Sequence, residues 1–275
     1  MSSTTITQSA EYALAPGENA DGLLNVLHGI YSPAGRQALL EAGLTPGMGV
    51  ADFGCGTGTM TRMLASMVGP SGTVTGIDLN APQLRQAAGI CAAEDLKNAS
   101  FHNADACNTA LPANFFDLAY CRFLLLHLPN PEACVQEMWR VLKPGGIVVI
   151  EDGDLTSAGS VPPTALDAFA YLFRRMGPIR GVDYSISNRL AHIVANAGFS
   201  ALGMKVHQPA ERAGASGLLL KWSVEEAGPA FVDAGIITNT QLKHTLSHMA
   251  KAVVDPNVLS FAPRMSVVWG RKIVS

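Results

Sequence analysis

The stretch Gly49–Thr61 reads GVADFGCGTGTMT and decides the fold of the chain. An apolar run ends in three glycines at alternate positions, Gly54, Gly56 and Gly58, and a helical pattern of apolar residues follows. Glycine accepts positive φ and lets a ligand approach the backbone, while the first N–H groups of a helix offer partners to anionic oxygens. The stretch therefore predicts a strand, a tight turn and a helix, with a nucleotide or a nucleoside-bearing cofactor at the turn.

Around this turn, short apolar or β-branched runs alternate with longer helical patterns, which is typical of βαβ units and a parallel sheet. We expect five strands, at 48–53, 73–78, 99–104, 115–121 and 146–151. Apolar residues at helical spacing predict helices at 60–67, 81–96 and 131–142. The predicted fold class is α/β, with a doubly wound sheet that is buried on both faces.

The residues before this core read as helical. They predict two helices broken at Tyr31, with Ser32 as the N-cap of the second and Pro33 in its first turn. His28, Tyr31 and Tyr12 are candidates for a cover over the cofactor, although all three could equally be interface or core residues.

The residues after the core predict two more strands with an insertion between them. The strands are expected near 201–208 and over 264–274, and the insertion contains an amphipathic helix with Leu242, Leu246 and Met249 on its apolar side. Four parts are predicted: an N-terminal helical cover (1–44), a cofactor-binding core (45–208), a helical insertion over the pocket (209–262) and the final strand of the core sheet (263–275).

Composition limits the partners. Of 275 residues, 48% are hydrophobic and only 15% are charged, and the net charge is −3, so nothing electrostatic favours nucleic acid or an anionic membrane. Five cysteines without a CxxC pair argue against a disulfide framework, and no secretory signal or membrane-length apolar run is present. We expect a soluble cytoplasmic protein that acts on a small molecule and has a homodimer as one possible assembly.

Two acidic residues follow the glycine turn at positions that suit adenosine. Asp78 ends the second strand, where a carboxylate can accept hydrogen bonds from both ribose hydroxyls. Asp105 lies just past the third strand, where it can accept a hydrogen bond from the exocyclic amine of adenine. Adenosine is therefore the economical interpretation.

Two adenosine cofactors compete for this turn. A dinucleotide needs the spacing GxGxxG, but here the third glycine comes one residue early and Asp52 stands immediately before the loop. An acid there would repel a pyrophosphate, yet it suits the ammonium group of S-adenosylmethionine, whose carboxylate can meet the helix amides. The residues favour S-adenosylmethionine.

Five motifs in order carry a family resemblance. They are VADFGCGTGT, VTGIDLN, NADA, FDLAYCRFLLLHLPNPEACVQEMWRVLKPGGIVVIED and ANAGF. Over roughly residues 45–208 the chain resembles the class I S-adenosylmethionine-dependent methyltransferases that act on small molecules. The resemblance implies a Rossmann-like, seven-stranded sheet whose last strand is antiparallel, with the cofactor over the carboxyl ends of the first strands.

The resemblance also implies a set of cofactor contacts. Leu79 and Ala106 would flank the adenine, and Cys121 and Arg122 would face the methionine part, where the arginine could also reach the cofactor carboxylate. The full set is Asp52, Gly54, Cys55, Gly56, Gly58, Asp78, Leu79, Asp105, Ala106, Cys121 and Arg122. The chain departs from many members at Ala51, where a larger aliphatic residue is usual.

Methyl transfer is an in-line displacement at an activated carbon, so the protein must align the acceptor and exclude water. A base is needed only if the accepting atom still holds its proton. Glu151 and Asp152, at the end of the fifth strand, are candidates to orient or deprotonate the acceptor, and a solvated carboxylate pair is the alternative. His127 is a third candidate base, with a structural histidine beside the sheet as the preferred alternative.

Some other side chains carry weaker signals. His244 and His248 stand four apart on a helix and could seat a metal, but no third ligand completes a site, so no metal is predicted. Phe169, Tyr171 and Phe173 suit the core, although some of them could line an acceptor pocket.

Three functions remain open from the sequence. The leading one is a methyltransferase for a small organic acceptor. The second is a non-methylating enzyme of the same fold, in which the bound sulfonium acts electrostatically on a cyclisation or rearrangement. The third is a cofactor-binding regulator that has lost catalysis, against which the intact loop and both adenosine-binding acids argue.

Overall fold

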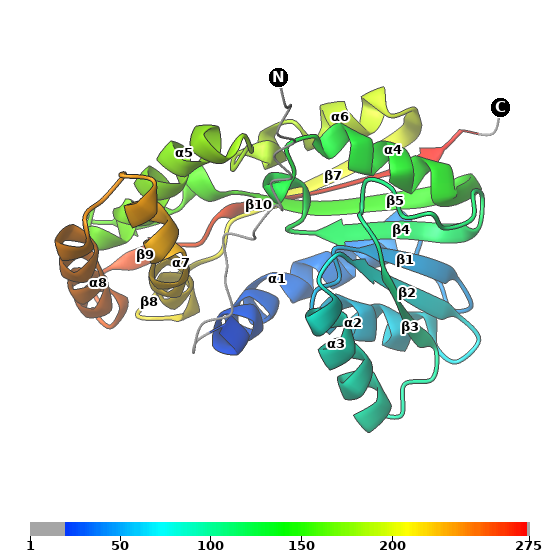
Figure 1. Cartoon of the computed structure of the whole chain (residues 1–275), viewed down its shortest axis with the longest axis horizontal. Coiled ribbons are helices and arrows are strands. Elements are labelled where there is room, and N and C mark those ends of the chain that lie inside the picture. Colours follow the sequence, from blue (N-terminus) through cyan, green and yellow to red (C-terminus); the bar gives the residue numbers. More distant parts are fainter. Residues whose placement is uncertain (1–19, 274–275) are drawn as a thin grey trace, which may run out of the picture.

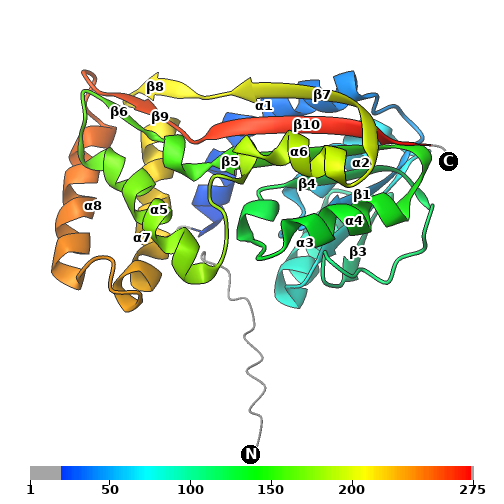
Figure 2. The same ribbon diagram turned by 90° about the horizontal axis from the view of Figure 1, so that it is seen from above.

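A seven-stranded sheet forms the centre of the molecule, in the order β3-β2-β1-β4-β5-β10-β7 (Figure 1). The computed structural model describes residues 20–273. The strands are β1 (Gly49–Phe53), β2 (Thr73–Asp78), β3 (Ala99–Asn103), β4 (Phe116–Arg122), β5 (Leu142–Asp154), β7 (Phe199–His207) and β10 (Arg264–Lys272). β10 lies between β5 and β7 and is antiparallel to both, whereas the other pairs are parallel (Figure 2). The predicted α/β class and the antiparallel last strand are confirmed.

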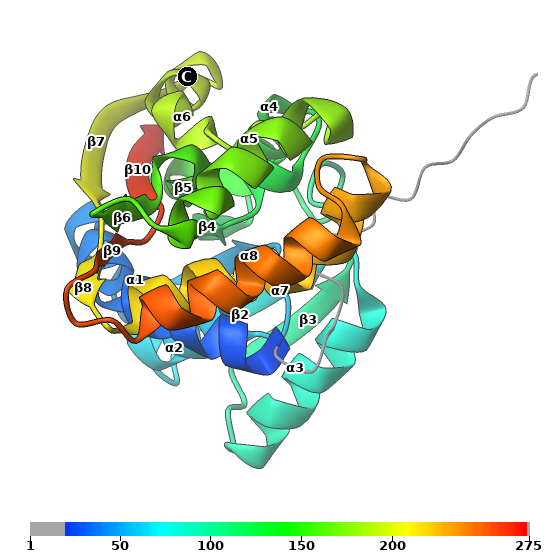
Figure 3. The same ribbon diagram turned by 90° about the vertical axis from the view of Figure 1, so that its left-hand side faces the viewer.

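Helices cover both faces of this sheet, as the apolar strands require. They are α1 (Ala20–Ala42), α2 (Thr59–Val68), α3 (Ala81–Ala93), α4 (Pro131–Val141), α5 (Ala168–Arg180), α6 (Leu190–Asn196), α7 (Ala215–Asp233) and α8 (Asn239–Val253). One hydrophobic core joins α1 and α2 to one face of the sheet, and a second core joins α4, α5 and α6 to the other (Figure 3).

The N-terminal helix corrects the predicted break at Tyr31. α1 is continuous and contains Pro33, so it is one helix where two were expected. Pro33 removes one helical hydrogen bond, but the packing of its neighbours holds the helix together. The ring of Tyr31 is fully buried and its hydroxyl donates a hydrogen bond of 2.8 Å to the carbonyl oxygen of Pro263. Ser32 does not cap a helix, because its hydroxyl contacts His28 and Arg122 instead.

A second, three-stranded sheet was not expected from the sequence. It consists of β6 (Gly159–Val161), β9 (Leu259–Phe261) and β8 (Ala210–Arg212), in that order and antiparallel. It lies with α7 and α8 on the left of Figure 1. The amphipathic helix expected in the insertion is α8, whereas α7 was missed because its apolar residues, such as the run Leu218–Leu220, do not follow one stripe.

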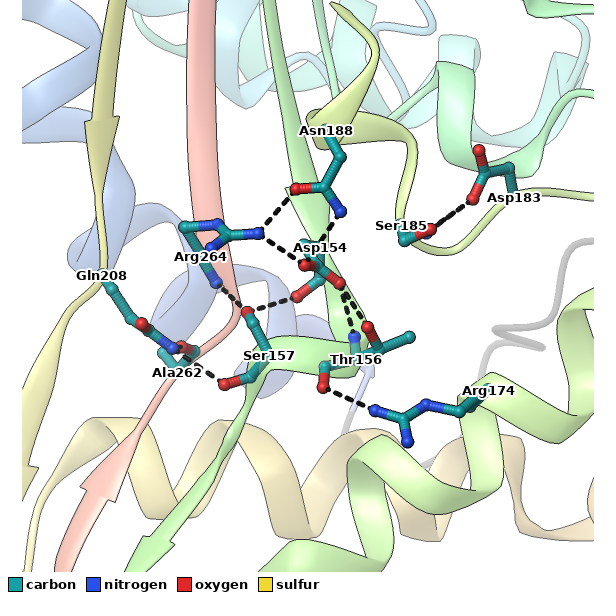
Figure 4. A network of polar contacts seen from close by, with 10 residues as sticks. All are labelled: Asp154, Thr156, Ser157, Arg174, Asp183, Ser185, Asn188, Gln208, Ala262 and Arg264. Atoms are coloured by element: carbon teal, nitrogen blue, oxygen red, sulfur yellow. Dashed lines mark hydrogen bonds and ion pairs between the residues drawn. The ribbon is translucent and has the colours of Figure 1, made fainter.

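A polar network lies at one end of the large sheet, where the chain leaves β5 for β6 and returns from β9 to β10 (Figure 4). Asp154, at the end of β5, accepts a hydrogen bond of 2.8 Å from the guanidinium of Arg264, at the start of β10. Asn188 and Thr156 also donate to the Asp154 carboxylate, and Ser157 accepts from the backbone N–H of Arg264 at 2.8 Å. These bonds fix the ends of two strands that meet beside the pocket described below.

Candidate functional site

The glycine turn after β1 has the backbone conformation that its sequence predicts. The φ angles of Gly54, Gly56 and Gly58 are 68°, 54° and 78°, all in the left-handed region. Gly58 is also the N-cap of α2, and a Cβ at that position would come within 2.8 Å of the Cβ of Ala87. Glycine is therefore required at this helix start both for its φ and for the space that it leaves.

Asp78 connects the turn to the end of β2. One of its carboxylate oxygens accepts from the backbone N–H of Gly56 and the other from that of Asn80, each at 2.8 Å. Asn80 in turn caps α3 through a bond of 3.1 Å from the N–H of Gln83. The carboxylate thus faces the turn, and each oxygen keeps a further lone pair for a ligand hydroxyl.

Asp52 lies at the base of the turn and is 1% exposed. Its carboxylate accepts a hydrogen bond of 2.6 Å from the hydroxyl of Thr61. Burial raises the pKa of Asp52 to about 7, although the Thr61 hydroxyl and the charge of Arg122 act in the opposite direction. A cationic group arriving beside this carboxylate would favour its charged form.

One pocket of about 500 Å³ extends from the glycine turn across to the helices. Its turn side includes Asp52, the glycine loop and Asp78, together with residues at the start of α2 and α3. The opposite side is mostly apolar and is supplied by α1, α5 and α7 among others; it includes Leu27, Tyr31, Leu126, Phe169, Phe173 and Leu219. Arg122, His127, Ser223 and Glu226 also line the pocket.

The structure brings seven of the predicted site residues together in this lining. They are Asp52, Gly54, Cys55, Gly56, Asp78, Arg122 and His127. The others predicted for the cofactor are Gly58, Leu79, Asp105, Ala106 and Cys121, and these lie outside the lining. Cys121 is fully buried within β4, and Tyr12 lies outside the described residues.

The residues expected beside adenine lie on two neighbouring loops. Leu79 is 61% exposed, and the Asn103 side-chain amide donates a hydrogen bond of 3.0 Å to its carbonyl oxygen. Asp105 is also exposed and accepts a bond of 2.8 Å from the N–H of Cys107. The loops after β2 and β3 are thus tied together at the edge of the pocket.

The sequence predicted that Glu151 lies at the rim where the fifth strand ends. That prediction is wrong, because β5 continues to Asp154. Glu151 is 0% exposed and lies beneath α1, where the hydroxyl of Tyr120 donates a bond of 2.9 Å to its Oε1. Burial raises the pKa of Glu151. Gly35 of α1 sits directly over the carboxylate, and a Cβ there would clash with both of its oxygens.

Asp152 points to the opposite face of β5 and is likewise fully buried, so the solvated pair considered as an alternative is also wrong. Its carboxylate accepts from the N–H groups of Leu125 at 2.8 Å, Leu126 at 3.2 Å and Gly153 at 2.9 Å. Asp152 therefore holds the short 3₁₀ turn η1 (Leu125–His127), which carries His127 into the pocket lining.

His127 contacts Tyr184 edge to face, with ring centroids 6.1 Å apart. Burial, with a smaller effect of the Arg180 charge, lowers the pKa of His127 to about 4. The imidazole is therefore neutral at pH 7.

Arg122 connects β4 to α1, a connection that sequence reasoning did not find. Its guanidinium donates to the Ser32 hydroxyl at 3.0 Å and lies 3.4 Å from Nδ1 of His28. Burial and the charge of Arg122 lower the pKa of His28. Pocket residues such as Leu27, Ser223 and Glu226 were also missed, because α1 and α7 reach the pocket only through tertiary packing, which leaves no local signal.

No group of three or more metal-binding side chains occurs among residues 20–273. The imidazoles of His244 and His248 on α8 contact each other in a tilted arrangement, with centroids 4.1 Å apart and the rings at 45°. None of the helices in the described part of the chain has the length and apolar character that crossing a membrane requires.

Comparison with known proteins identifies a family match within the core and relatives that are similar over about half of this chain. Residues 50–146 match a family model described as "Methyltransferase domain". The nocamycin O-methyltransferase of Saccharothrix syringae is 32% identical over 150 residues, 54% of this chain and 49% of that protein. The demethylmenaquinone methyltransferase of Desulfitobacterium hafniense is 33% identical over 147 residues, 53% of this chain and 56% of that protein. The matches thus span about half the length of these curated relatives.

Solved structures share the fold at lower identity. A Haemonchus contortus phosphoethanolamine N-methyltransferase, in complex with phosphomonomethylethanolamine and S-adenosylhomocysteine, has a TM-score of 0.60 at 17% identity, covering 92% of this chain and 57% of that one. The [4+2]-cyclase SpnF has a TM-score of 0.53 at 18% identity, covering 96% of this chain and 86% of that one. The same architecture therefore occurs in proteins with different named reactions.

Proposed function

We propose that this chain, whose residues 50–146 match a methyltransferase-domain model, is a class I, S-adenosylmethionine-dependent methyltransferase that transfers a methyl group to a small, mainly apolar acceptor. The observation that carries the proposal is the two-sided composition of one pocket. Asp52, the glycine loop and Asp78 lie on one side, and apolar side chains from three helices lie on the other.

The turn side of the pocket fits the cofactor chemically. The three left-handed glycines leave bare backbone at the start of α2, which has no side-chain cap. Asp52 is a buried carboxylate whose raised pKa a ligand ammonium would lower. Asp78 retains acceptor capacity for two ribose hydroxyls. These three features support binding of an adenosine with an amino-acid tail.

We assign the remaining cofactor contacts as the family resemblance implies. Leu79, Asp105 and Ala106 would border the adenine, with the two loops tied by Asn103 as support for that placement. Cys121, through its backbone, and Arg122 would face the methionine part. When bound, the cofactor supplies a methyl group that positive sulfur has already activated.

The chain's own residues would then align the acceptor and keep water out. The apolar half of the pocket supports an acceptor with extensive apolar surface. We propose that His127, neutral at pH 7, accepts a hydrogen bond from the acceptor. For Asp152 we propose a positioning role through η1, and for Glu151 a role beneath α1, since neither lines the pocket.

A cytoplasmic location is part of this proposal, supported by five cysteines spaced without a CxxC pair. The division into a cover, a core and an insertion is likewise proposed on the basis of the sequence pattern. A homodimer stays a prediction.

The proposal is tested first by calorimetry with S-adenosylhomocysteine. We expect Asp78→Ala to weaken binding by about 1–3 kcal/mol through loss of charge-assisted hydrogen bonds. Asp117→Ala is the matched control, because Asp117 bonds to Gly49 and Lys143 and lies outside the pocket lining. Unchanged affinity in Asp78→Ala would remove Asp78 from the ribose role, and no binding by the unmodified protein would refute the proposed function.

Incubation with S-adenosylmethionine and candidate acceptors separates methylation from the alternatives. Release of S-adenosylhomocysteine together with a methylated acceptor is the expected result. Conversion of an acceptor without that release would indicate the non-methylating enzyme, and binding without conversion of any acceptor would favour a regulator.

A further inference from the structure

A second cavity lies directly behind the apolar half of the pocket. It has a volume of about 420 Å³ and is bordered by the end of α5, residues 181–185 and the residues just before and at the start of α4. We call it the outer chamber. Thr156, Arg174, Asp183 and Ser185, which are drawn in Figure 4, belong to its lining.

Phe173 lines both the pocket and the outer chamber. Its ring contacts Phe169 with centroids 4.7 Å apart, Tyr184 at 5.3 Å and Phe231 at 5.2 Å. Phe173 is therefore a buried core side chain that lies between the two spaces and contacts three other rings.

The chemistry of the outer chamber suits an uncharged, apolar ligand. Leu128, Pro131, Pro178 and Val182 contribute apolar surface beside Phe173. The charge of Arg189 is matched within the chain, because it pairs with Asp183 at 3.0 Å and with Glu132 at 3.4 Å. Arg174 also lines the chamber; it is exposed and donates a hydrogen bond of 3.3 Å to the carbonyl oxygen of Thr156, so solvent screens its charge. A ligand there therefore needs no charge of its own.

Tyr184 provides a second observation beside Phe173. It is 2% exposed, and its hydroxyl has no hydrogen-bond partner among residues 20–273. A buried donor without a partner is unfavourable. Burial also raises the pKa of Tyr184, so the hydroxyl keeps its proton. An oxygen on a ligand that passes Phe173 would satisfy this donor.

We propose that the outer chamber is the second half of the acceptor site. An elongated acceptor would place its methylated part in the pocket and an uncharged apolar extension past Phe173 into the outer chamber, so that Phe173 determines how long an acceptor the site takes. This inference rests on the proposed function, since it assumes that the apolar half of the pocket holds the acceptor.

The test uses binding of 4-alkylphenols, from 4-ethylphenol to 4-octylphenol, measured by calorimetry on the full chain. In the unmodified protein, affinity should rise by up to about fourfold per methylene through the longest members. Pro129→Trp places a large side chain at an exposed position that lines only the outer chamber. It should lower the octyl-to-ethyl affinity ratio at least tenfold and leave 4-ethylphenol binding unchanged.

Phe173→Ala removes the side chain between the two spaces and should raise the same ratio. Tyr171→Ala is its control on the same helix, because Tyr171 is 54% exposed and lines neither cavity. If Phe173→Ala does not fold, the octyl-to-ethyl affinity ratio of Pro129→Trp alone tests the proposal. Equal ratios in the unmodified protein and Pro129→Trp, or no binding of any alkylphenol, would overturn the proposal.

Binding of S-adenosylhomocysteine, measured in each variant, keeps this test separate from the proposed function. A chain that binds the nucleoside but gives the same alkylphenol ratio in every variant would refute only the two-chamber site. A chain that fails to bind the nucleoside would refute the function, whatever the alkylphenols do.

Discussion

Asp52 is the residue at which stability and ligand binding conflict most directly. Its carboxylate is almost fully buried, and its pKa is raised from 3.8 to about 7 by that burial. If no ligand bound beside the Asp52 carboxylate, a neutral residue at this position would make the folded protein more stable. The charge is useful only when a cation arrives, which is why we assign Asp52 to the ammonium group of the cofactor.

The affinity for S-adenosylmethionine should therefore depend on pH. Below about pH 7 Asp52 increasingly holds a proton and loses its attraction for the ammonium group, so affinity should fall by up to tenfold per pH unit between pH 7 and 5. Calorimetry at pH 5, 6 and 7 measures this. Asp52→Asn should bind weakly with no such slope, and a flat profile in the unmodified protein would contradict the assignment.

Asp52 also makes the stability of the protein depend on pH. Stability should rise as the pH falls, whereas the affinity for S-adenosylmethionine should fall. Because the folded-state pKa of about 7 lies above the ordinary value of 3.8, the folded protein binds more protons between these values. The contribution of Asp52 to stability is thus full below about pH 4 and is lost as the pH rises through 7. Asp52→Asn should raise the Tm of the ligand-free protein by a few degrees at pH 8 and leave it unchanged near pH 4. A lower Tm of Asp52→Asn at pH 8 would show that the charged Asp52 carboxylate does not destabilise the folded protein at that pH.

At the scale of elements, the junction between β1 and α2 depends on Gly58. Gly58 has a φ of 78° and a Cβ there would meet Ala87 at 2.8 Å, while Gly145 has the same φ with nothing within 4 Å. Gly145→Ala therefore adds only backbone strain, about 1 kcal/mol, and Gly58→Ala adds that strain plus overpacking, about 2–4 kcal/mol in total.

Urea unfolding of both variants measures the difference in free energy of unfolding between the two glycine positions. Equal losses of unfolding free energy in Gly58→Ala and Gly145→Ala would mean that α3, which carries Ala87, shifts without an energetic cost. A larger loss in Gly58→Ala, accompanied by weaker S-adenosylhomocysteine binding, is the expected result.

At the scale of the whole molecule, the contact between Arg264 and Asp154 ties the start of β10 to the end of β5, where the chain leaves the large sheet for the small one and returns from it. Asp154 has a side chain 6% exposed, and Arg264 is 37% exposed. Arg264→Met should lower the free energy of unfolding by about 2–3 kcal/mol, less than for a fully buried pair because water already reaches the guanidinium.

Arg189→Met is the control for this prediction. Arg189 pairs with two carboxylates but is half exposed, so its loss should change the free energy of unfolding by about 0.5–1 kcal/mol. Urea unfolding compares the two variants. A loss in Arg264→Met no greater than in the control would show that the ends of β5 and β10 stay paired without this contact.

The sequence predicted the parts of the molecule that local chemistry determines. The turn at Gly54–Gly58 was predicted correctly, because its glycines carry a conformational requirement that no tertiary contact has to supply. The strands of the large sheet and their approximate bounds followed from apolar runs, which a sheet covered on both faces requires.

The remaining features depend on contacts between distant residues. Pro33 suggested a helix start, but Tyr31 anchors a continuous helix to Pro263, far away in the sequence. Glu151 and Asp152 read as a polar strand end, yet α1 and η1 bury them. No local pattern indicates that a helix more than a hundred residues earlier carries Gly35 over a carboxylate.

The position of β10 has a consequence for synthesis on the ribosome. β5 ends at Asp154, and the strand that pairs with it begins at Arg264. The nascent chain therefore holds an open, hydrophobic strand edge while the intervening segment is translated, an interval on the order of ten seconds at ordinary elongation rates. Unpaired edges of this kind are where chains aggregate. Yield in cells should accordingly respond to chaperones that shield nascent chains, more than it would for a fold whose central strands are made in succession.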